Sequence, residues 1–151
     1  MITYNEVVNN ITKLTPFILE YEKELIDAKK ECKIGGLVER QLKYLPGYTE
    51  HRFNQLQEIE AVLSYLNTEL RRIKQKHYKK YLEAYAKALS SRDAEKYAYA
   101  EDDVIEFEIL INGVALLRNK YLGIIKAFES LGYNLSAIAR LKIAGMEDIS
   151  T

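Results

Sequence analysis

The feature that most limits what this chain can fold into is its shortage of residues that break helices. It has two prolines and seven glycines among 151 residues, and the segment from Thr49 to Leu89 contains neither. Segments without proline and glycine can stay helical over many turns. We therefore expect an all-α fold of long antiparallel helices with coiled-coil-like packing, plus short capping helices, that assembles as a homo-oligomer.

Within this segment, large side chains recur at alternating spacings of four and three residues. The positions are Ile59, Leu63, Leu66, Leu70, Ile73 and His77. This is the a/d pattern of a coiled-coil seam, kept over about two and a half heptads, and it favours a partner helix along the same stripe. The partner helix can belong to the same chain.

Cap-type residues, prolines and glycines predict where the helices before this segment begin and end. Residues 3–6 have the spacing of a capping box, and Thr15-Pro16 offers a second start with proline at the first helical position. We expect this first helical region to reach about Lys33, before Gly35-Gly36. A short helix should follow at 37–44 and stop at Pro46-Gly47.

After residue 90 the same signals predict a short helix at 93–99 and a start at Asp102-Asp103, whose charges suit a helix N-terminus. A second long helix should run from Val104 to Leu131-Gly132, and a final helix from Leu135 to about Ala144. We expect four substantial helices.

The length fits one domain. Three regions divide it: residues 1–48 form an N-terminal helical region, 49–90 a long basic helix, and 93–151 the C-terminal helices that are expected to oligomerise. The single cysteine, Cys32, and a start without a basic or apolar leader predict a cytoplasmic protein. Apolar runs stay shorter than the roughly 18 residues that span a bilayer, so we expect no membrane partner.

Positive charge is concentrated between residues 71 and 81, which hold six basic residues and no acidic one in a chain of zero net charge. On a helix, Arg72, Lys76 and Lys79 share one stripe opposite the seam. Tyrosines at 78, 81 and 85 form the neighbouring stripe. Cations beside aromatic rings are what a single-stranded nucleic acid site requires. The candidate binding residues are Arg71, Arg72, Lys74, Lys76, Tyr78, Lys79, Lys80 and Tyr81.

Other interpretations of this segment stay open. A basic helix face can be merely solvated, or it can bind a phospholipid surface or an acidic protein. Tyrosines often pack in half-buried helix interfaces instead of stacking on bases. His77 lies on the seam and is more typical of a packed residue than of a catalyst.

The sequence contains none of the common catalytic motifs. It has no glycine-rich phosphate loop, nucleophile elbow, zinc-ligand spacing or HExxH motif, so we expect no enzyme and no cofactor. The acidic segment 93–108 lacks the spacing of a calcium loop and has no histidine nearby in sequence, which predicts no metal site. Helix capping and attraction to a basic face account for these carboxylates better.

The second long helix carries an apolar surface wider than one intrachain neighbour needs, which predicts an oligomer interface. Its residues are Ile109, Leu110, Val114, Leu117, Tyr121, Ile124, Ile125 and Phe128. The alternative is that this helix forms the core of a monomeric bundle, because a fully buried helix has the same pattern.

The half of the chain from about Lys76 onward resembles the phage recombination mediator family typified by UvsY. The resemblance lies in the order of a basic, tyrosine-rich helix end (76–81), a polar break (90–93), an acidic cap (101–105), and a long apolar helix (109–128). It closes with Gly132-Tyr133-Asn134-Leu135-Ser136-Ala137-Ile138. Residues 3–48 give no match.

The resemblance implies a small helical protein that forms a closed homo-oligomeric ring of the hexamer or heptamer class. Such a protein binds single-stranded DNA without sequence preference, helps to displace the single-strand-binding protein, and loads a RecA-like recombinase. The competing hypothesis is a helical scaffold or assembly protein, such as a phage small terminase or a virion-assembly chaperone. A small terminase should carry a helix-turn-helix element, and residues 37–52 show no convincing one.

Overall fold

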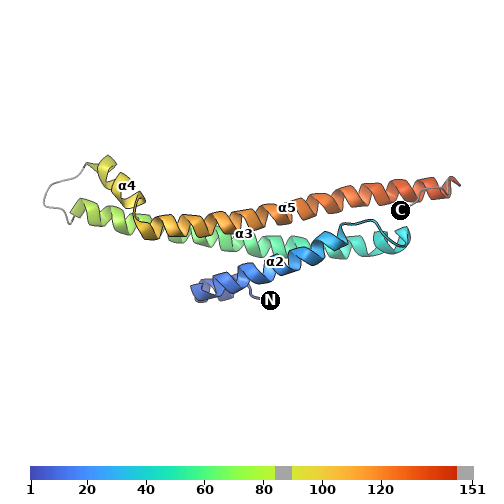
Figure 1. The fold of residues 1–151 in the computed structure, drawn as a ribbon, viewed down its shortest axis with the longest axis horizontal. Coiled ribbons are helices and arrows are strands. Elements are labelled where there is room, and N and C mark those ends of the chain that lie inside the picture. The colour runs from blue at the N-terminus through green and yellow to red at the C-terminus, as the bar shows by residue number, and fades with distance from the viewer. Residues whose placement is uncertain (84–89, 146–151) are drawn as a thin grey trace. The chain divides into compact units, whose positions relative to one another are not determined.

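The computed structural model describes residues 1–83 and 90–145, and these residues are nearly all helical. In chain order the elements are α1 (Tyr4–Asn9), a 3₁₀ helix η1 (Ile11–Lys13), α2 (Leu14–Glu31), α3 (Val38–Glu83), α4 (Ser91–Tyr99) and α5 (Asp102–Ile143) (Figure 1). The described residues contain no strand, which confirms the predicted all-α class. Coiled-coil packing and the homo-oligomer stay predictions.

Two compact units can be distinguished along the chain. The first comprises residues 1–59 and the described residues from 117 onward, and the second comprises the described residues between 60 and 116. Helices α3 and α5 each contribute residues to both units. Each unit has apolar residues in its own interior, so each is described separately.

In the first unit, α2 buries one face whose residues follow helical spacing. Phe17, Tyr21 and Leu25 are buried at steps of four residues. The rings of Phe17 and Tyr21 stack with their centroids 4.2 Å apart. The hydroxyl of Tyr121, on α5, donates a hydrogen bond of 2.8 Å to the Tyr21 carbonyl oxygen. This bond satisfies the polar tip of a fully buried tyrosine and links α5 to α2.

A buried arginine of α3 connects the same unit to α2 by charge. The Arg52 side chain is 3% exposed, and its guanidinium lies 2.7 Å from a Glu24 carboxylate oxygen and 2.6 Å from one of Glu31. The guanidinium also donates to the Gln55 side-chain oxygen at 2.9 Å. Glu24 and Glu31 are seven residues apart and therefore share one face of α2, which lets a single guanidinium bind both.

The prediction that a short helix ends at Pro46-Gly47 was wrong. α3 continues through Pro46 without a break, although proline cannot donate a backbone hydrogen bond and disfavours a helix interior. The Thr49 hydroxyl donates to the Leu45 carbonyl at 2.9 Å, which adds a local bond beside the proline. Packing of Val38 on one side and Arg52 on the other holds both flanks, so tertiary contacts outweigh the local cost.

The prediction that the second long helix ends at Gly132 was also wrong. α5 runs unbroken to Ile143, and the glycine with a positive φ that follows it is Gly145, at 79°. Gly132 has a packing role instead, because a Cβ atom there would lie 3.3 Å from Leu45 Cδ2. The glycine therefore allows the Leu45 side chain of α3 to approach α5 closely. The separate final helix predicted at 135–144 is the last part of α5.

The predicted helix starts and the predicted break are confirmed in part. The capping box is confirmed: Glu6 accepts a hydrogen bond from the Thr3 backbone N–H at 2.9 Å. The start expected at Thr15-Pro16 is wrong by two residues, because α2 begins at Leu14 and Pro16 is its third residue instead of its first. There its missing N–H is still one of those that a helix leaves unpaired. The predicted break around Gly35-Gly36 is confirmed, with Gly36 at a φ of 73°.

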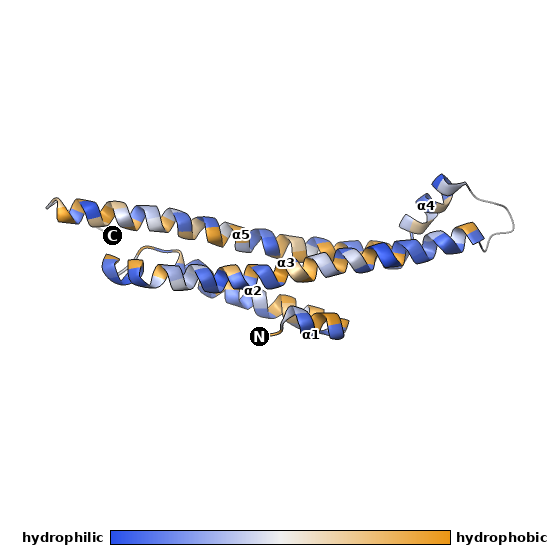
Figure 2. Cartoon of the chain, turned by 180° about the vertical axis from the view of Figure 1, so that it is seen from behind, coloured by the Kyte–Doolittle hydropathy of each residue, from blue (hydrophilic) through white to orange (hydrophobic). Residues whose placement is uncertain are grey.

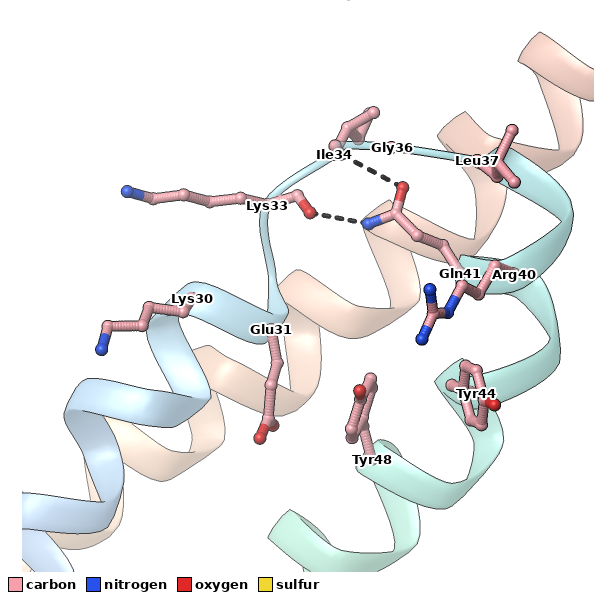
Figure 3. A pocket seen from close by; sticks show the side chains of 11 residues that line it. Lys30, Glu31, Lys33, Ile34, Gly36, Leu37, Arg40, Gln41, Tyr44 and Tyr48 are labelled. Carbon is pink, nitrogen blue, oxygen red and sulfur yellow. Dashed lines mark hydrogen bonds between the residues drawn. The ribbon is translucent and has the colours of Figure 1, made fainter.

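The loop between α2 and α3 is held by one side chain. The Gln41 amide donates to the Lys33 carbonyl at 2.8 Å and accepts from the Gly35 N–H at 3.2 Å, as the dashed lines in Figure 3 show. A pocket of about 710 Å³ lies under this loop. Arg40, Tyr44 and Tyr48 line it from α3. Gln41 thus replaces backbone hydrogen bonds that the turn cannot supply.

In the second unit, the seam residues of α3 form the interior. Leu63, Leu66 and Leu70 are buried, while Ile73 and His77 are half-buried. The predicted short helix at 93–99 is confirmed as α4, and the Ser90 hydroxyl caps it by accepting from the Asp93 N–H. Residues 84–89 of the expected 49–90 helix lie outside the described residues.

Replacing Arg52 with alanine should destabilise the protein strongly. The change leaves two neighbouring carboxylates without their shared cation, so we expect the free energy of unfolding to fall by about 2–4 kcal/mol. This expected loss lies near the lower end of the range for breaking a buried ion pair, because the Glu24 side chain is still 33% exposed. Urea denaturation measures the change. Lys30→Ala, which removes an exposed pair with Asp27, is the control and should change stability by less than about 0.5 kcal/mol. Equal losses in both variants would contradict the prediction.

Acid should weaken the same network. The hydrogen bonds from Arg52 and then Gln55 lower the pKa of Glu24 below its usual value of 4.5. Because the unfolded chain binds a proton at higher pH, this stabilisation is complete above the unfolded pKa and is lost as the pH falls through the lower folded pKa. Below about pH 4.5, the unfolding free energy of the parent should therefore decline more steeply than that of Arg52→Ala. Parallel pH profiles in urea titrations would refute this.

Candidate nucleic-acid interface

The last turns of α3 present a row of exposed cations. Arg71, Arg72, Lys76, Lys79 and Lys80 are exposed, and we call these five residues the cationic ridge. They face outward because the opposite side of the same helix carries the buried leucines of the seam. Figure 2 shows this end of α3 as mostly hydrophilic ribbon. Five of the nucleic-acid-binding residues predicted from the sequence therefore share an accessible surface.

A shallow groove of about 630 Å³ runs along the ridge and is lined by Arg71, Arg72, Lys76 and Lys79 with Thr68 and Gln75. Arg72 has an ion pair, 2.8 Å from Glu69. Among the described residues, no carboxylate lies within ion-pair distance of Lys76 or Lys79. Their charge is therefore available to an external anion.

Lys74 differs from the other basic residues of the segment. Its ammonium group lies 3.1 Å from a Glu108 carboxylate oxygen of α5 and 4.4 Å from the centre of the Tyr99 ring of α4. The side chain is therefore half-buried and joins three helices of the second unit. Its charge is shared between a carboxylate and an aromatic face, so Lys74 contributes less to an outward-facing site than its neighbours.

The tyrosines of the segment do not form one exposed platform. The Tyr81 hydroxyl donates a hydrogen bond to Glu101 at 2.5 Å, and the Tyr81 ring stacks on Tyr97 with centroids 5.6 Å apart. Tyr78 is half-buried, and Tyr85 lies outside the described residues. Tyr81 thus helps to fix α4 and the turn before α5 onto α3, as the packing alternative expected.

A second hollow next to the ridge contains residues that the sequence reasoning missed. Arg71, Lys74, Gln75 and Tyr78 of α3 and Ser91, Arg92, Glu95 and Tyr99 of α4 line a space of about 550 Å³, which we call the α3–α4 cleft. Arg92 and Tyr99 are seven residues apart and fall on one face of α4. That spacing was a usable signal, but it points to a site only once α4 is placed beside α3.

His77 is the centre of a small charged cluster. Its Nε2 atom lies 2.9 Å from both carboxylate oxygens of Asp103. Its buried Nδ1 atom has no hydrogen-bond partner among the described residues and lies 3.9 Å from a Glu101 carboxylate oxygen. The hydrogen bond from His77 lowers the pKa of Asp103. The ring therefore bridges α3 and the start of α5, which agrees with the interpretation of His77 as a packed residue of the seam.

The same three side chains form a group able to approach a metal ion, with potential ligand atoms within 4.8 Å of one another. His77 is distant in sequence from the acidic segment at 93–108, so spacing along the chain did not place a histidine beside it. In the structure, a different ring nitrogen faces each carboxylate. The two carboxylates therefore lie on different sides of the imidazole instead of converging with it on one point, which is the geometry of a side-chain bridge between α3 and the start of α5.

The eight apolar candidates for an oligomer interface divide into three groups. Five are buried within the chain: Val114, Leu117, Tyr121, Ile124 and Phe128. Ile125 is half-buried, while Leu110 and Ile109 are exposed, the latter to 64%. Two further exposed side chains of α5, Ile105 and Leu116, accompany them. The exposed residues are available to a second molecule, whereas the buried ones already pack against other parts of the chain.

Comparisons with known proteins leave the family open. No family model matches the chain, and no curated protein or solved structure gives a significant match. In the described part of the chain, none of the helices has a stretch that is both long and apolar enough to cross a bilayer.

Replacing His77 with alanine should loosen the contact between α3 and the start of α5. Removal of the imidazole leaves Asp103 without its main partner and opens a void in a half-buried site, so we expect a loss of about 1–3 kcal/mol in unfolding free energy. Chemical denaturation measures it. His51→Ala is the control, because this exposed histidine lies 3.8 Å from Glu24 and contributes only a weak pair. If His77→Ala lowers the unfolding free energy as little as His51→Ala does, His77 does not stabilise the contact between α3 and α5.

Proposed function

We propose that this protein is a recombination mediator: it binds single-stranded DNA without sequence preference and loads a RecA-like recombinase onto strands coated by single-strand-binding protein. The cationic ridge is the observation that carries the proposal. Two of its exposed lysines, Lys76 and Lys79, line a common groove and lack carboxylate partners among the described residues, as contacts to a phosphate backbone require. The resemblance of the order of segments to the UvsY-type family is our reason for linking the protein to recombination.

Contacts of this kind explain why binding should ignore the base sequence. Phosphate groups repeat along every strand, and flexible lysines can follow them without reading base edges. The ridge lies on a regular helix whose inner face is buried, so its cations are held at a fixed spacing. A single ridge with about five cations binds weakly at physiological salt.

Assembly converts weak sites into strong binding. A closed ring, which we propose to be of the hexamer or heptamer class, presents many ridges to one strand and gains affinity from effective concentration. Four of the exposed apolar residues of α5, Ile105, Ile109, Leu110 and Leu116, are the surface that we propose for contact between subunits. Burying them between subunits would remove apolar area from water without disturbing the chain's own interior.

This arrangement also suggests how a strand is passed between proteins. A strand that follows several ridges takes a path set by the ring, and this path can be unfavourable for single-strand-binding protein yet suitable for a recombinase. The protein itself supplies binding and geometry, and we propose no catalytic step.

The ridge predicts a specific defect in DNA binding. Changing Lys76, Lys79 and Lys80 together to alanine should weaken binding to labelled single-stranded DNA at low salt by at least tenfold, because three phosphate contacts are lost. The slope of log affinity against log salt should become shallower by about two, since each contact contributes roughly 0.7. Fluorescence anisotropy over a salt series measures both values.

A matched control removes the same charge elsewhere. Lys23, Lys29 and Lys30 are exposed on α2, and their triple alanine variant should keep the salt slope of the parent. Light scattering on the same samples reports the oligomeric state. If the ridge variant binds like the parent, the DNA-binding proposal fails. The ridge would then be better explained as a contact for acidic protein, as a scaffold or assembly protein would use it.

A further inference from the structure

The α3–α4 cleft differs from the ridge in having aromatic walls. Tyr99 is 45% exposed at one side, and the half-buried Tyr78 lies at the other. The volume of about 550 Å³ falls within the range of sites that hold small organic groups, roughly 300–1,000 Å³. None of the described residues that line the ridge groove is aromatic. The cleft therefore suits a flat ring, which the groove alone does not.

The Tyr99 ring is held in place by its neighbours. Its hydroxyl is hydrogen-bonded to Glu95 one turn earlier on α4, and this bond raises the pKa of Tyr99. The ammonium group of Lys74 lies 4.4 Å from the ring centre and is itself anchored to Glu108. An ordered aromatic wall binds a ring with little loss of side-chain entropy.

Two arginines lie at the cleft without a carboxylate partner. Among the described residues, no acidic group is within ion-pair distance of Arg71 or Arg92, although Glu95 is close enough to line the same space. The Arg71 guanidinium donates to the Thr68 hydroxyl at 3.3 Å, and its other donors have no partner in the described part of the chain. These donors suit a phosphate group next to the aromatic walls.

The cleft and the ridge groove share a border. Arg71 and Gln75 line both, because they lie between the outer face of α3 and the side that faces α4. A strand whose phosphates follow the ridge thus passes the mouth of the cleft. In a duplex the bases are paired and stacked inside, whereas an unpaired base is free to turn aside.

We infer that the α3–α4 cleft accepts one unpaired base of the bound strand, with the adjacent phosphate on Arg71 and Arg92, and that this contact makes the protein prefer single strands to duplex. This inference rests on the proposed function and adds to it α4 and the residues Arg92 and Tyr99. The ridge supplies salt-dependent affinity for any phosphate backbone, and the cleft supplies selection for exposed bases.

The test compares a short labelled oligothymidylate, an abasic strand of the same length and a duplex, each bound to the full-length protein. Arg92→Gln and Tyr99→Leu remove the charge and the ring from the cleft. Lys96→Gln removes a charge from the same helix outside the cleft, and Tyr133→Leu removes an exposed tyrosine from α5. Thermal unfolding by circular dichroism, with equal midpoints, selects the variants that keep their fold.

Tyr99→Leu should weaken oligothymidylate binding about 5- to 150-fold, as expected for one stacked base, and should leave abasic binding unchanged. Arg92→Gln should weaken binding to both single strands by a smaller factor. Both variants should lose preference for single strands, and both controls should bind like the parent. If the parent binds but does not distinguish thymidylate from abasic strands, or if Tyr99→Leu affects both equally, the cleft inference is wrong while the ridge proposal stands. If the parent binds neither strand at low salt, both fail.

Discussion

The interaction on which the first unit depends most is the binding of the buried Arg52 guanidinium by side chains of α2 and α3. The guanidinium is almost completely removed from water, and this is tolerable only because two carboxylates of α2 and the amide oxygen of Gln55 use its donors. A buried guanidinium without such partners would cost several kcal/mol. The requirement fixes which residues of α2 face α3, and the bond from Tyr121 to the Tyr21 carbonyl adds α5 to the same arrangement.

In the second unit, polar contacts likewise hold the helices together at the C-terminal end of the seam. Leucines fill the interior up to Leu70, and beyond it His77 and Tyr81 replace apolar side chains with contacts to Asp103 and Glu101. These acidic residues belong to the segment that begins α5. By pairing with the inner side of α3, they leave the opposite side of the helix with an excess of positive charge, and the ridge is that side.

The candidate site was partly predictable for this reason. A run of six basic residues with no acidic one on an amphipathic helix has to place some of them outward, so the exposure of Lys76, Lys79 and Lys80 follows from spacing alone. Spacing could not show that Lys74 and Tyr81 turn inward, because their partners Glu108 and Glu101 are distant in sequence. It also could not show the cleft, since Arg92 and Tyr99 acquire a role only when α4 lies against α3.

The sequence by itself determined the helical class, the cap at Thr3, the short helix that ends at Tyr99, the break near Gly36, and the inward face of the seam. These depend on local hydrogen bonds and on a repeat within one helix, which a single segment specifies. Tertiary structure decided the rest. α3 passes through Pro46 and α5 through Gly132 because burial of Val38 and Arg52, and the close approach of Leu45 to Gly132, outweigh local preferences against helix. Energies of this kind arise between segments that meet only in the folded chain.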